Sequence, residues 1–194
     1  MFAAIMVYVD EQITQFDLQA ALATISPQRR EQALRFKFEL GQRTCVLAYL
    51  LLKKALRQEY GITENPLFDY GEHGKPFIVG HPDIHFNLSH CREAVACVLS
   101  NRPVGIDVES VHRYKEGLAA YTMNGEELAE LAAAEQPAAA FVRLWTMKEA
   151  RLKLTGEGIG NDLKTALADR DRYRFTTVER LDRNYIYTVC EELI

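Results

Sequence analysis

Two long segments with helical patterning constrain the fold of this 194-residue chain most strongly. In the first, residues 42–60, the apolar run Cys45–Leu52 covers every side of a helix, which predicts a helix that is buried nearly all round. The second covers residues 138–155 and also places its apolar residues at helical spacing. Each segment precedes a strand-rich stretch. We therefore expect an α+β fold of two similar halves, residues 1–103 and 104–194.

Alternation of apolar and polar residues predicts the strands. A strand is expected at the start of the chain, three in the middle and two at the end, over residues 3–9, 84–89, 94–99, 104–109, 172–181 and 184–190. The short connection Asn101–Pro103 suggests that the third and fourth of these strands form a hairpin. A shorter helix is expected to begin at Ser26 and Pro27, and residues 63–83 are rich in glycine and proline and are expected to be loop.

Composition excludes several classes of protein. The formal net charge of −4 argues against a broad nucleic-acid surface. The four cysteines are scattered with no CxxC pair, which argues against a zinc site and suits reduced thiols in the cytoplasm. The apolar start of the chain is too short to cross a membrane and lacks the features of a secretory signal. We expect a cytoplasmic protein with no membrane or nucleic-acid partner.

The stretch Val104–Ser110 carries two acids within a predicted strand. Asp107 and Glu109 lie two residues apart and share one face, with their α-carbons roughly 6.5–7 Å from each other. Two carboxylates at this spacing disfavour each other's ionisation, and a cation between them would reverse that effect. The alternative for this stretch alone is a half-exposed strand whose acids face water.

The second long helix carries its own charged group. Glu149 and Lys153 are spaced i, i+4, and Lys148 adds another cation. Taken alone, these residues would form a solvated salt-bridge face. The following GEGIG is not a dinucleotide-binding fingerprint, because it follows a helix rather than a strand, and the chain contains no P-loop.

Four motifs taken in order give a more specific signal. GKPFI begins at Gly74, FNLSH at Phe86 and GIDVE at Gly105, and WTMKEARLKLTGEG begins at Trp145, about forty residues after the third. This ordered set, from about residue 26 to residue 160, resembles the Sfp-type 4′-phosphopantetheinyl transferases.

The resemblance implies a fold and a reaction. It implies two halves related by a pseudo-two-fold axis, with the active site between them. The family moves the phosphopantetheine arm of coenzyme A to a serine of an apo acyl or peptidyl carrier protein, and releases adenosine 3′,5′-bisphosphate. Mg²⁺ prefers oxygen ligands near phosphates, so Asp107, Glu109 and Glu149 are the expected metal ligands. The catalytic residues are expected to be Glu149, Lys153 and Asp107, and the proton acceptor remains open between Glu149 and Asp107.

The resemblance also implies coenzyme A contacts for a set of polar residues, namely Arg43, Lys75, Ser89, His90 and Lys153. Two departures from the family pattern affect this set. Arginines at 29, 30 and 35 stand where the family often has two lysines, and Cys91 and Arg92 follow His90 where the family often has Ser-Gly. Which of the three arginines contacts coenzyme A, and the conformation of the loop after His90, therefore remain open.

The alternative function is a coenzyme A- or carrier-binding module without catalysis. The presence of every expected metal and pyrophosphate residue argues against it. The sequence does not identify the carrier, and the protein is expected to act as a monomer because one chain supplies the whole site.

Overall fold

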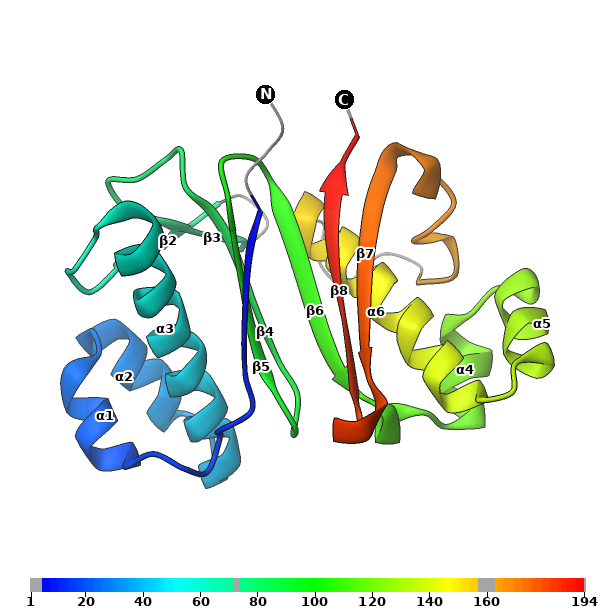
Figure 1. Ribbon diagram of the computed structural model, residues 1–194, viewed down its shortest axis with the longest axis horizontal. Helices are drawn as coiled ribbons and strands as arrows, with labels where there is room; N and C mark the ends of the chain where they lie inside the picture. Colours follow the sequence, from blue (N-terminus) through cyan, green and yellow to red (C-terminus); the bar gives the residue numbers. More distant parts are fainter. Residues whose placement is uncertain (1–4, 72–73, 157–162, 194) are drawn as a thin grey trace.

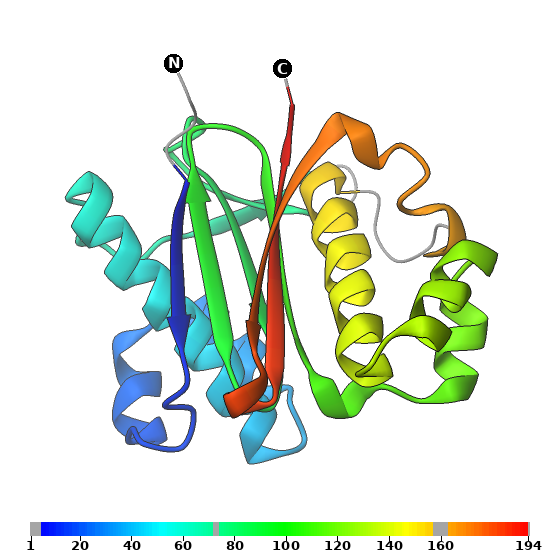
Figure 2. The ribbon, with the colours of Figure 1, turned by 45° about the vertical axis from the view of Figure 1, so that its right-hand side comes forward.

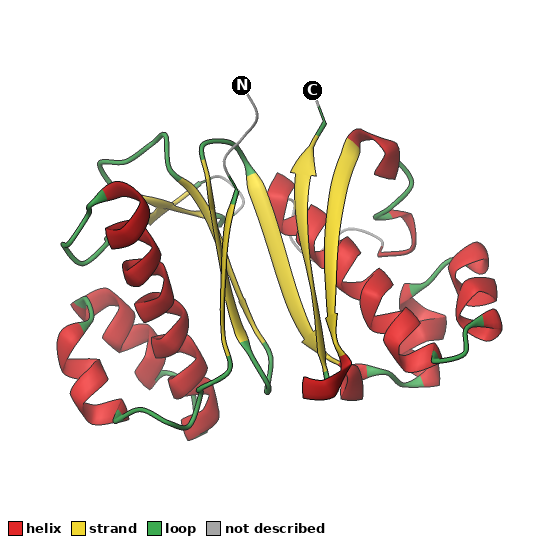
Figure 3. Cartoon of the chain, in the orientation of Figure 1, coloured by secondary structure: helices red, strands yellow, loops and turns green. Residues whose placement is uncertain are grey.

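The computed structural model describes residues 5–71, 74–156 and 163–193, and it has four layers. Helices form both outer layers, and two three-stranded sheets lie between them (Figures 1 and 3). The predicted α+β class is confirmed. The predicted division after residue 103 falls in the connection between the two sheets.

The first half runs from β1 to β5. It contains the helices α1 (Leu18–Thr24), α2 (Pro27–Leu34) and α3 (Glu39–Tyr60), and the strands β1 (Met6–Asp10), β2 (Phe68–Tyr70), β3 (Pro76–Ile78), β4 (His85–His90) and β5 (Val95–Ser100). Its main sheet is antiparallel with the order β1-β5-β4, and β2 and β3 form a separate hairpin. The α1 helix, capped by Asp17, was not predicted, and the 63–83 segment predicted as loop contains the β2–β3 hairpin.

The second half repeats this succession. It contains the strands β6 (Val104–Ser110), β7 (Tyr173–Arg180) and β8 (Tyr185–Glu192), and the helices α4 (Glu116–Thr122), α5 (Gly125–Ala133) and α6 (Pro137–Thr155). Short 3₁₀ turns occur at Val111–Arg113, Leu163–Thr165, Arg170–Arg172 and Leu181–Arg183. In both halves the sheet order is first, third and second strand, and the long helix lies between the first and second strands in sequence. This repetition agrees with the predicted two-half fold.

One predicted pairing is wrong. We expected residues 94–99 and 104–109 to form a hairpin, but β5 pairs with β1 and β4, whereas β6 pairs with β8. Both edges of β5 are already occupied, so the chain must leave this sheet after Ser100 and begin the second one. The short 101–103 connection therefore joins two sheets.

The core is divided by these sheets. Alternate residues of β5 face opposite ways: Val95, Cys97 and Leu99 pack in the cluster that contains α3. Ala96 and Val98 pack in the cluster between the sheets, together with apolar residues of β6. All six residues of β5 are buried, as expected for a strand that is covered on both faces.

The outer face of the second sheet is covered by α6, with α4 and α5 beyond it (Figure 2). Gly105 allows α6 to approach the strand closely, because a Cβ at this position would come within 2.0 Å of the Ala150 carbonyl oxygen. Within the described residues, no helix is long and apolar enough to cross a membrane.

Candidate active site

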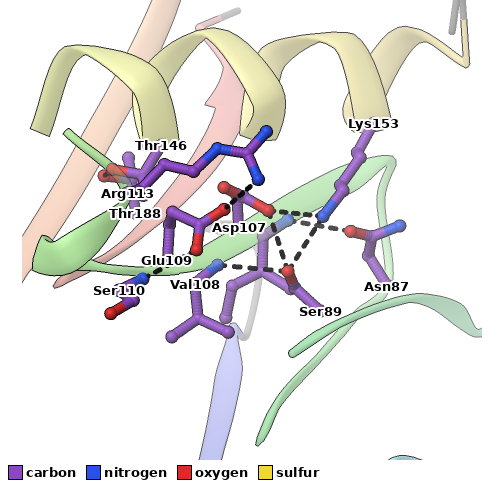
Figure 4. A network of polar contacts seen from close by, with 11 residues as sticks. Asn87, Ser89, Asp107, Val108, Glu109, Ser110, Arg113, Thr146, Lys153 and Thr188 are labelled. Atoms are coloured by element: carbon purple, nitrogen blue, oxygen red, sulfur yellow. Dashed lines mark hydrogen bonds and ion pairs between the residues drawn. The ribbon is translucent and has the colours of Figure 1, made fainter. Parts of the chain in front are cut away.

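The two acids of β6 face α6 rather than water. Asp107 is buried and Glu109 is partly buried, and the apolar residues that alternate with them pack between the two sheets. Since Gly105 brings α6 against this same strand face, residues of α6 meet the acids directly (Figure 4). The strand alternation therefore predicted the shared face correctly, and the alternative that both acids are solvated is wrong for Asp107.

Lys153, Asp107 and Ser89 form the centre of the site (Figure 4). The Lys153 ammonium donates to Asp107 Oδ1 at 2.6 Å and to Ser89 Oγ at 2.9 Å. The Ser89 hydroxyl donates to Asp107 Oδ1 at 2.8 Å. The three residues come from α6, β6 and β4, so this network joins the two halves of the chain. Charge-assisted hydrogen bonds of this length are among the stronger polar contacts in proteins.

Two polar side chains of β4 hold the free edge of β6. Asn87 Oδ1 accepts from the Ile106 amide at 3.0 Å, and Ser89 Oγ accepts from the Val108 amide at 3.1 Å. β4 and β6 therefore lie together without strand pairing. We did not single out Asn87 from the sequence, although the alternation in 84–89 places it on the same face as Ser89.

Glu109 lies at the exposed end of the site. One of its oxygens accepts from the Ser110 amide at 2.8 Å, and the other lies 3.7 Å from the Arg113 guanidinium. That guanidinium stacks on Trp145, 4.7 Å from the ring centroid. Desolvation is the main cause that raises the pKa of Glu109, and the neighbouring Asp107 adds to it.

Of the three candidate metal ligands, Glu149 is the one with a buried oxygen that has no hydrogen-bond partner in the part of the chain that the structure describes. It is buried, and its Oε1 has no hydrogen-bond partner among the described residues. Desolvation, followed by the charge of Asp107, raises its pKa. Lys153 pairs with Asp107, so the i, i+4 ion pair that we expected between Glu149 and Lys153 is not formed. A buried carboxylate oxygen without a donor is unusual and calls for a cation or proton.

Lys148 is not the solvated cation that the helix alone suggested. It is fully buried, and its ammonium lies 2.6 Å from Glu127 Oε2 and also donates to the carbonyls of Thr122 and Leu163. It therefore fastens α6 to α4 and α5 instead of serving the site.

A cavity of about 340 Å³ lies beside the network. Lys153 and His90 line it together with Arg29, so three basic side chains share its wall. Its apolar lining includes aromatic residues, namely Phe36, Phe68, Tyr70 and Phe86. A cavity with several cations and aromatic surfaces suits a phosphorylated ligand that also carries a planar ring.

The basic groups of this cavity interact electrostatically. Desolvation lowers the pKa of His90 most, and the charges of Lys153 and Arg29 lower it further. Of the three arginines that the sequence left open, Arg29 lines the cavity, while Arg30 donates to the Leu22 carbonyl and Arg35 pairs with Glu31. Arg29 donates to the Cys45 carbonyl through Nε and Nη2.

Three predicted coenzyme A residues, Arg43, Lys75 and Ser89, are not among the residues that line the cavity. Gly74 and Pro76 line it, but Lys75 between them donates to the Leu154 carbonyl at 2.7 Å and lies 3.4 Å from that of Val104. Burial lowers the pKa of Lys75 to about 8. Arg43 donates to the Phe16 carbonyl and pairs with Glu39 at 2.7 Å. The structure thus brings together Ser89, His90, Asp107 and Lys153, but not Arg43.

Comparison with known proteins identifies the family to which the chain belongs. Residues 103–193 match a family model described as the 4′-phosphopantetheinyl transferase superfamily, and residues 12–102 match one described as 4′-phosphopantetheinyl transferase, N-terminal. The 4′-phosphopantetheinyl transferase psf-1 of Bacillus pumilus is 31% identical over 171 residues, which cover 87% of this chain and 73% of that protein. The chain belongs to the 4′-phosphopantetheinyl transferase family. The resemblance inferred from the four motifs is therefore confirmed.

Two further 4′-phosphopantetheinyl transferases match most of this chain. The 4′-phosphopantetheinyl transferase Sfp of Bacillus subtilis (strain 168) is 30% identical over 156 residues, 79% of this chain and 70% of that protein. The 4′-phosphopantetheinyl transferase gsp of Aneurinibacillus migulanus is 29% identical over 194 residues, 98% of this chain and 81% of that protein.

The acids fit a hard divalent cation by their chemistry. Asp107, Glu109 and Glu149 offer only carboxylate oxygens, and Glu149 Oε1 lacks a donor. Among the described residues, however, no group of three or more His, Cys, Asp or Glu side chains is arranged so that it could hold a metal ion.

Proposed function

We propose that this transferase moves the 4′-phosphopantetheine arm of coenzyme A to a serine of an apo acyl or peptidyl carrier protein. The serine oxygen bonds to the phosphorus that carries the pantetheine. The bond from that phosphorus to the bridging oxygen breaks, and its electron pair leaves with adenosine 3′,5′-bisphosphate. The observation that supports this reaction best is the Asp107–Lys153 pair of 2.6 Å beside a cavity with three basic side chains.

The basic residues bind and stabilise the phosphates in this proposal. Lys153 uses one donor on Asp107 and one on Ser89, so the third N–H of its ammonium remains for a phosphoryl oxygen. Charge that develops on the leaving phosphate is stabilised there in a partly buried site. His90 and Arg29 suit the 3′-phosphate, since they share the cavity wall with Lys153.

Lys75 and Arg43 are weaker candidates for phosphate contacts. Both residues are implied by the family resemblance, but they donate to main-chain carbonyls. Neither residue lines the cavity, so we propose them as secondary contacts.

Glu149 is the proposed proton acceptor for the carrier serine, with Asp107 as the second candidate. A raised pKa and an unused oxygen suit Glu149 to take up a proton. Asp107 already accepts from Lys153 and Ser89 through one oxygen, which makes it the less available base.

Mg²⁺ is the proposed cofactor, held by Asp107, Glu109 and Glu149. When bound, it would offset the repulsion among the acids and polarise the phosphoryl oxygens. We further propose a monomer in the cytoplasm. All four cysteines are buried free thiols, which suits a reducing compartment.

Intact-mass spectrometry tests this function. An apo acyl carrier protein and an apo peptidyl carrier protein are each incubated with the enzyme, coenzyme A and Mg²⁺, and a parallel sample contains EDTA. A gain of one phosphopantetheine mass that EDTA abolishes supports both the reaction and the metal. Coenzyme A binding without a mass gain on either carrier would instead support the non-catalytic binding module.

A further inference from the structure

Arg113 brings to the site a cation that none of the four sequence motifs contains. It lies on the 3₁₀ turn that directly follows β6, and its guanidinium reaches toward Glu109 (Figure 4). Desolvation and then Asp107 raise the pKa of Glu149, whereas Lys153 and Arg113 lower it. Lys153 pairs with Asp107, and Arg113 pairs with Glu109. Each acid of β6 is therefore neutralised by a basic side chain of the same protein.

The pair between Arg113 and Glu109 is loose. Glu109 Oε1 accepts from the Ser110 amide at 2.8 Å, but Oε2 lies 3.7 Å from the Arg113 guanidinium, which is too long for a hydrogen bond. The Arg113 side chain is 45% exposed, and ion pairs with such exposure contribute little to stability. The pair thus offsets the charge of Glu109 without binding the carboxylate firmly, and a divalent cation with twice the charge can replace the guanidinium.

The guanidinium has a second partner that does not depend on Glu109. It stacks on Trp145 at 4.7 Å from the ring centroid, and Trp145 continues a row of rings through Phe141 to Tyr114, with centroids 5.8 and 5.5 Å apart. The attraction between a cation and an aromatic face persists without a carboxylate. Arg113 can therefore release Glu109 and stay on Trp145.

The cavity gives Lys153 and Arg113 different roles. Lys153 lines it and is the proposed phosphate contact, whereas Arg113 is not among the lining residues. A role on the acids therefore explains the position of Arg113 better than a role on the ligand. It also agrees with the arrangement of the acids, because no three His, Cys, Asp or Glu side chains of the described residues could hold a metal ion as they stand.

We infer that Arg113 is a positioning residue that holds Glu109 before the metal binds, and that a divalent cation must displace it from this carboxylate. The inference rests on the proposed function, in which Glu109 is a ligand of Mg²⁺. Arg113 then lowers the affinity of the site for the metal, since its charge both competes for Glu109 and repels the cation.

Binding of Mn²⁺ alone, without coenzyme A, tests this role. Electron paramagnetic resonance measures the free ion, whose signal is lost on binding. Arg113→Met removes the competing charge, so we expect it to bind Mn²⁺ about 3- to 10-fold more tightly than wild type. Arg113→Lys keeps the charge and should bind close to wild type. A merely structural Arg113 predicts weaker binding by Arg113→Met, because Glu109 would lose its placement. Unchanged or weaker binding, or no binding by either protein, would overturn the inference.

The matched control is Arg143→Met. The Arg143 side chain has a similar exposure of 39%, and it pairs with Glu179 at 2.7 Å, so its partner is not one of the three candidate metal ligands. This variant should keep the wild-type affinity for Mn²⁺. Glu149→Gln should weaken Mn²⁺ binding with and without Arg113→Met. If it does not, the tighter binding arises elsewhere and the inference fails.

Thermal unfolding gives a second readout, and the transfer assay keeps the two proposals apart. A ligand that binds the folded protein more tightly stabilises it more, so Mg²⁺ should raise the melting temperature of Arg113→Met by more than that of wild type. An active, EDTA-sensitive wild type with unchanged Mn²⁺ affinity in Arg113→Met rejects only the displacement. A wild type that transfers nothing, beside an Arg113→Met variant that binds Mn²⁺ more tightly, rejects the proposed reaction and supports the displacement.

Discussion

Gly105 of β6 lies directly beneath Ala150 of α6. A Cβ on Gly105 would come within 2.0 Å of the Ala150 carbonyl oxygen and 2.7 Å of the Leu154 amide. Both neighbours are backbone atoms of a buried helix, so neither can move aside cheaply. This contact fixes how closely α6, with Glu149 and Lys153, approaches the acids of β6.

Gly105→Ala should therefore damage both stability and activity. We expect a loss at or above the upper end of the roughly 1–3 kcal/mol typical of overpacking, because the clash is with main chain. Thermal unfolding and transfer rate measure the two effects. Gly117→Ala on α4 is the control, since a Cβ there meets nothing within 4 Å. Equal stability of the two variants would show that α6 can shift freely.

Glu149→Gln should remove activity without removing stability. We expect transfer to fall at least about 100-fold if Glu149 accepts the serine proton. The melting temperature should stay the same or rise, because the variant removes a buried carboxylate whose pKa is raised by desolvation and by Asp107. Any stabilisation by Mg²⁺ in a thermal-shift assay should weaken. Glu130→Gln, at an exposed position on α5, should behave as wild type, and full activity of Glu149→Gln would assign the base elsewhere.

His90 should make binding of adenosine 3′,5′-bisphosphate depend on pH. Desolvation and the charges of Lys153 and Arg29 hold its pKa below 6.5, while Asp107 acts in the opposite direction. A bound phosphate favours the protonated ring and raises the pKa, so affinity should increase as pH falls from about 8 toward 6. Titration of the ligand's own phosphates contributes to this pH dependence in both proteins. His90→Asn should lack the additional increase in affinity that the wild type shows. Identical pH profiles by calorimetry would place the 3′-phosphate away from His90.

Lys75 should make stability rise with pH. Its pKa is about 8 in the folded chain and 10.5 when unperturbed, so between these values the unfolded chain binds more protons. The buried charge therefore opposes folding most below pH 8, and this opposition is relieved as pH increases. Relative to Lys75→Met, wild type should gain melting temperature between pH 7 and pH 9.5. A constant difference between the two proteins over this range would argue against the shifted pKa.

The buried Lys148–Glu127 pair should be costly to break from one side. Lys148→Met leaves a buried carboxylate unpaired, and we expect a loss of about 3–5 kcal/mol in the free energy of unfolding. Adding Glu127→Gln removes that charge and should recover part of the loss, since the side chain can still accept from or donate to its neighbours. Denaturant unfolding of the two variants measures this. A double variant less stable than Lys148→Met would mean that Glu127 acts mainly through its contact with the Asn124 amide, 2.8 Å away.

The sequence predicted the elements of the site better than their contacts. The helices around Tyr49 and Leu144 and the strand face shared by Asp107 and Glu109 follow from local periodicity, which short-range backbone geometry determines. Strand partners do not follow from local periodicity, because β6 and β8 are distant in sequence and their pairing depends on which strand edges remain free. The hairpin predicted between β5 and β6 was wrong for this reason.

Contacts between α6 and the elements that pack against it could not be predicted from local pattern either. Lys153 pairs with Asp107 rather than with Glu149 because Gly105 brings α6 against β6, and no spacing rule within α6 contains that information. The burial of Lys148 likewise depends on α4 and α5 packing around it. The family resemblance suggested the candidate site residues, and the packing of the elements determines their hydrogen-bond and ion-pair partners.

The way Asn87 and Ser89 occupy the free edge of β6 also bears on solubility. An uncovered edge strand offers a row of amides and carbonyls to which a strand of another molecule can add, and such additions seed aggregates. Side chains from β4 occupy two of those amides, Ile106 and Val108. The two side chains that hold β4 against β6 therefore also block two of the amides to which a strand of another copy could add.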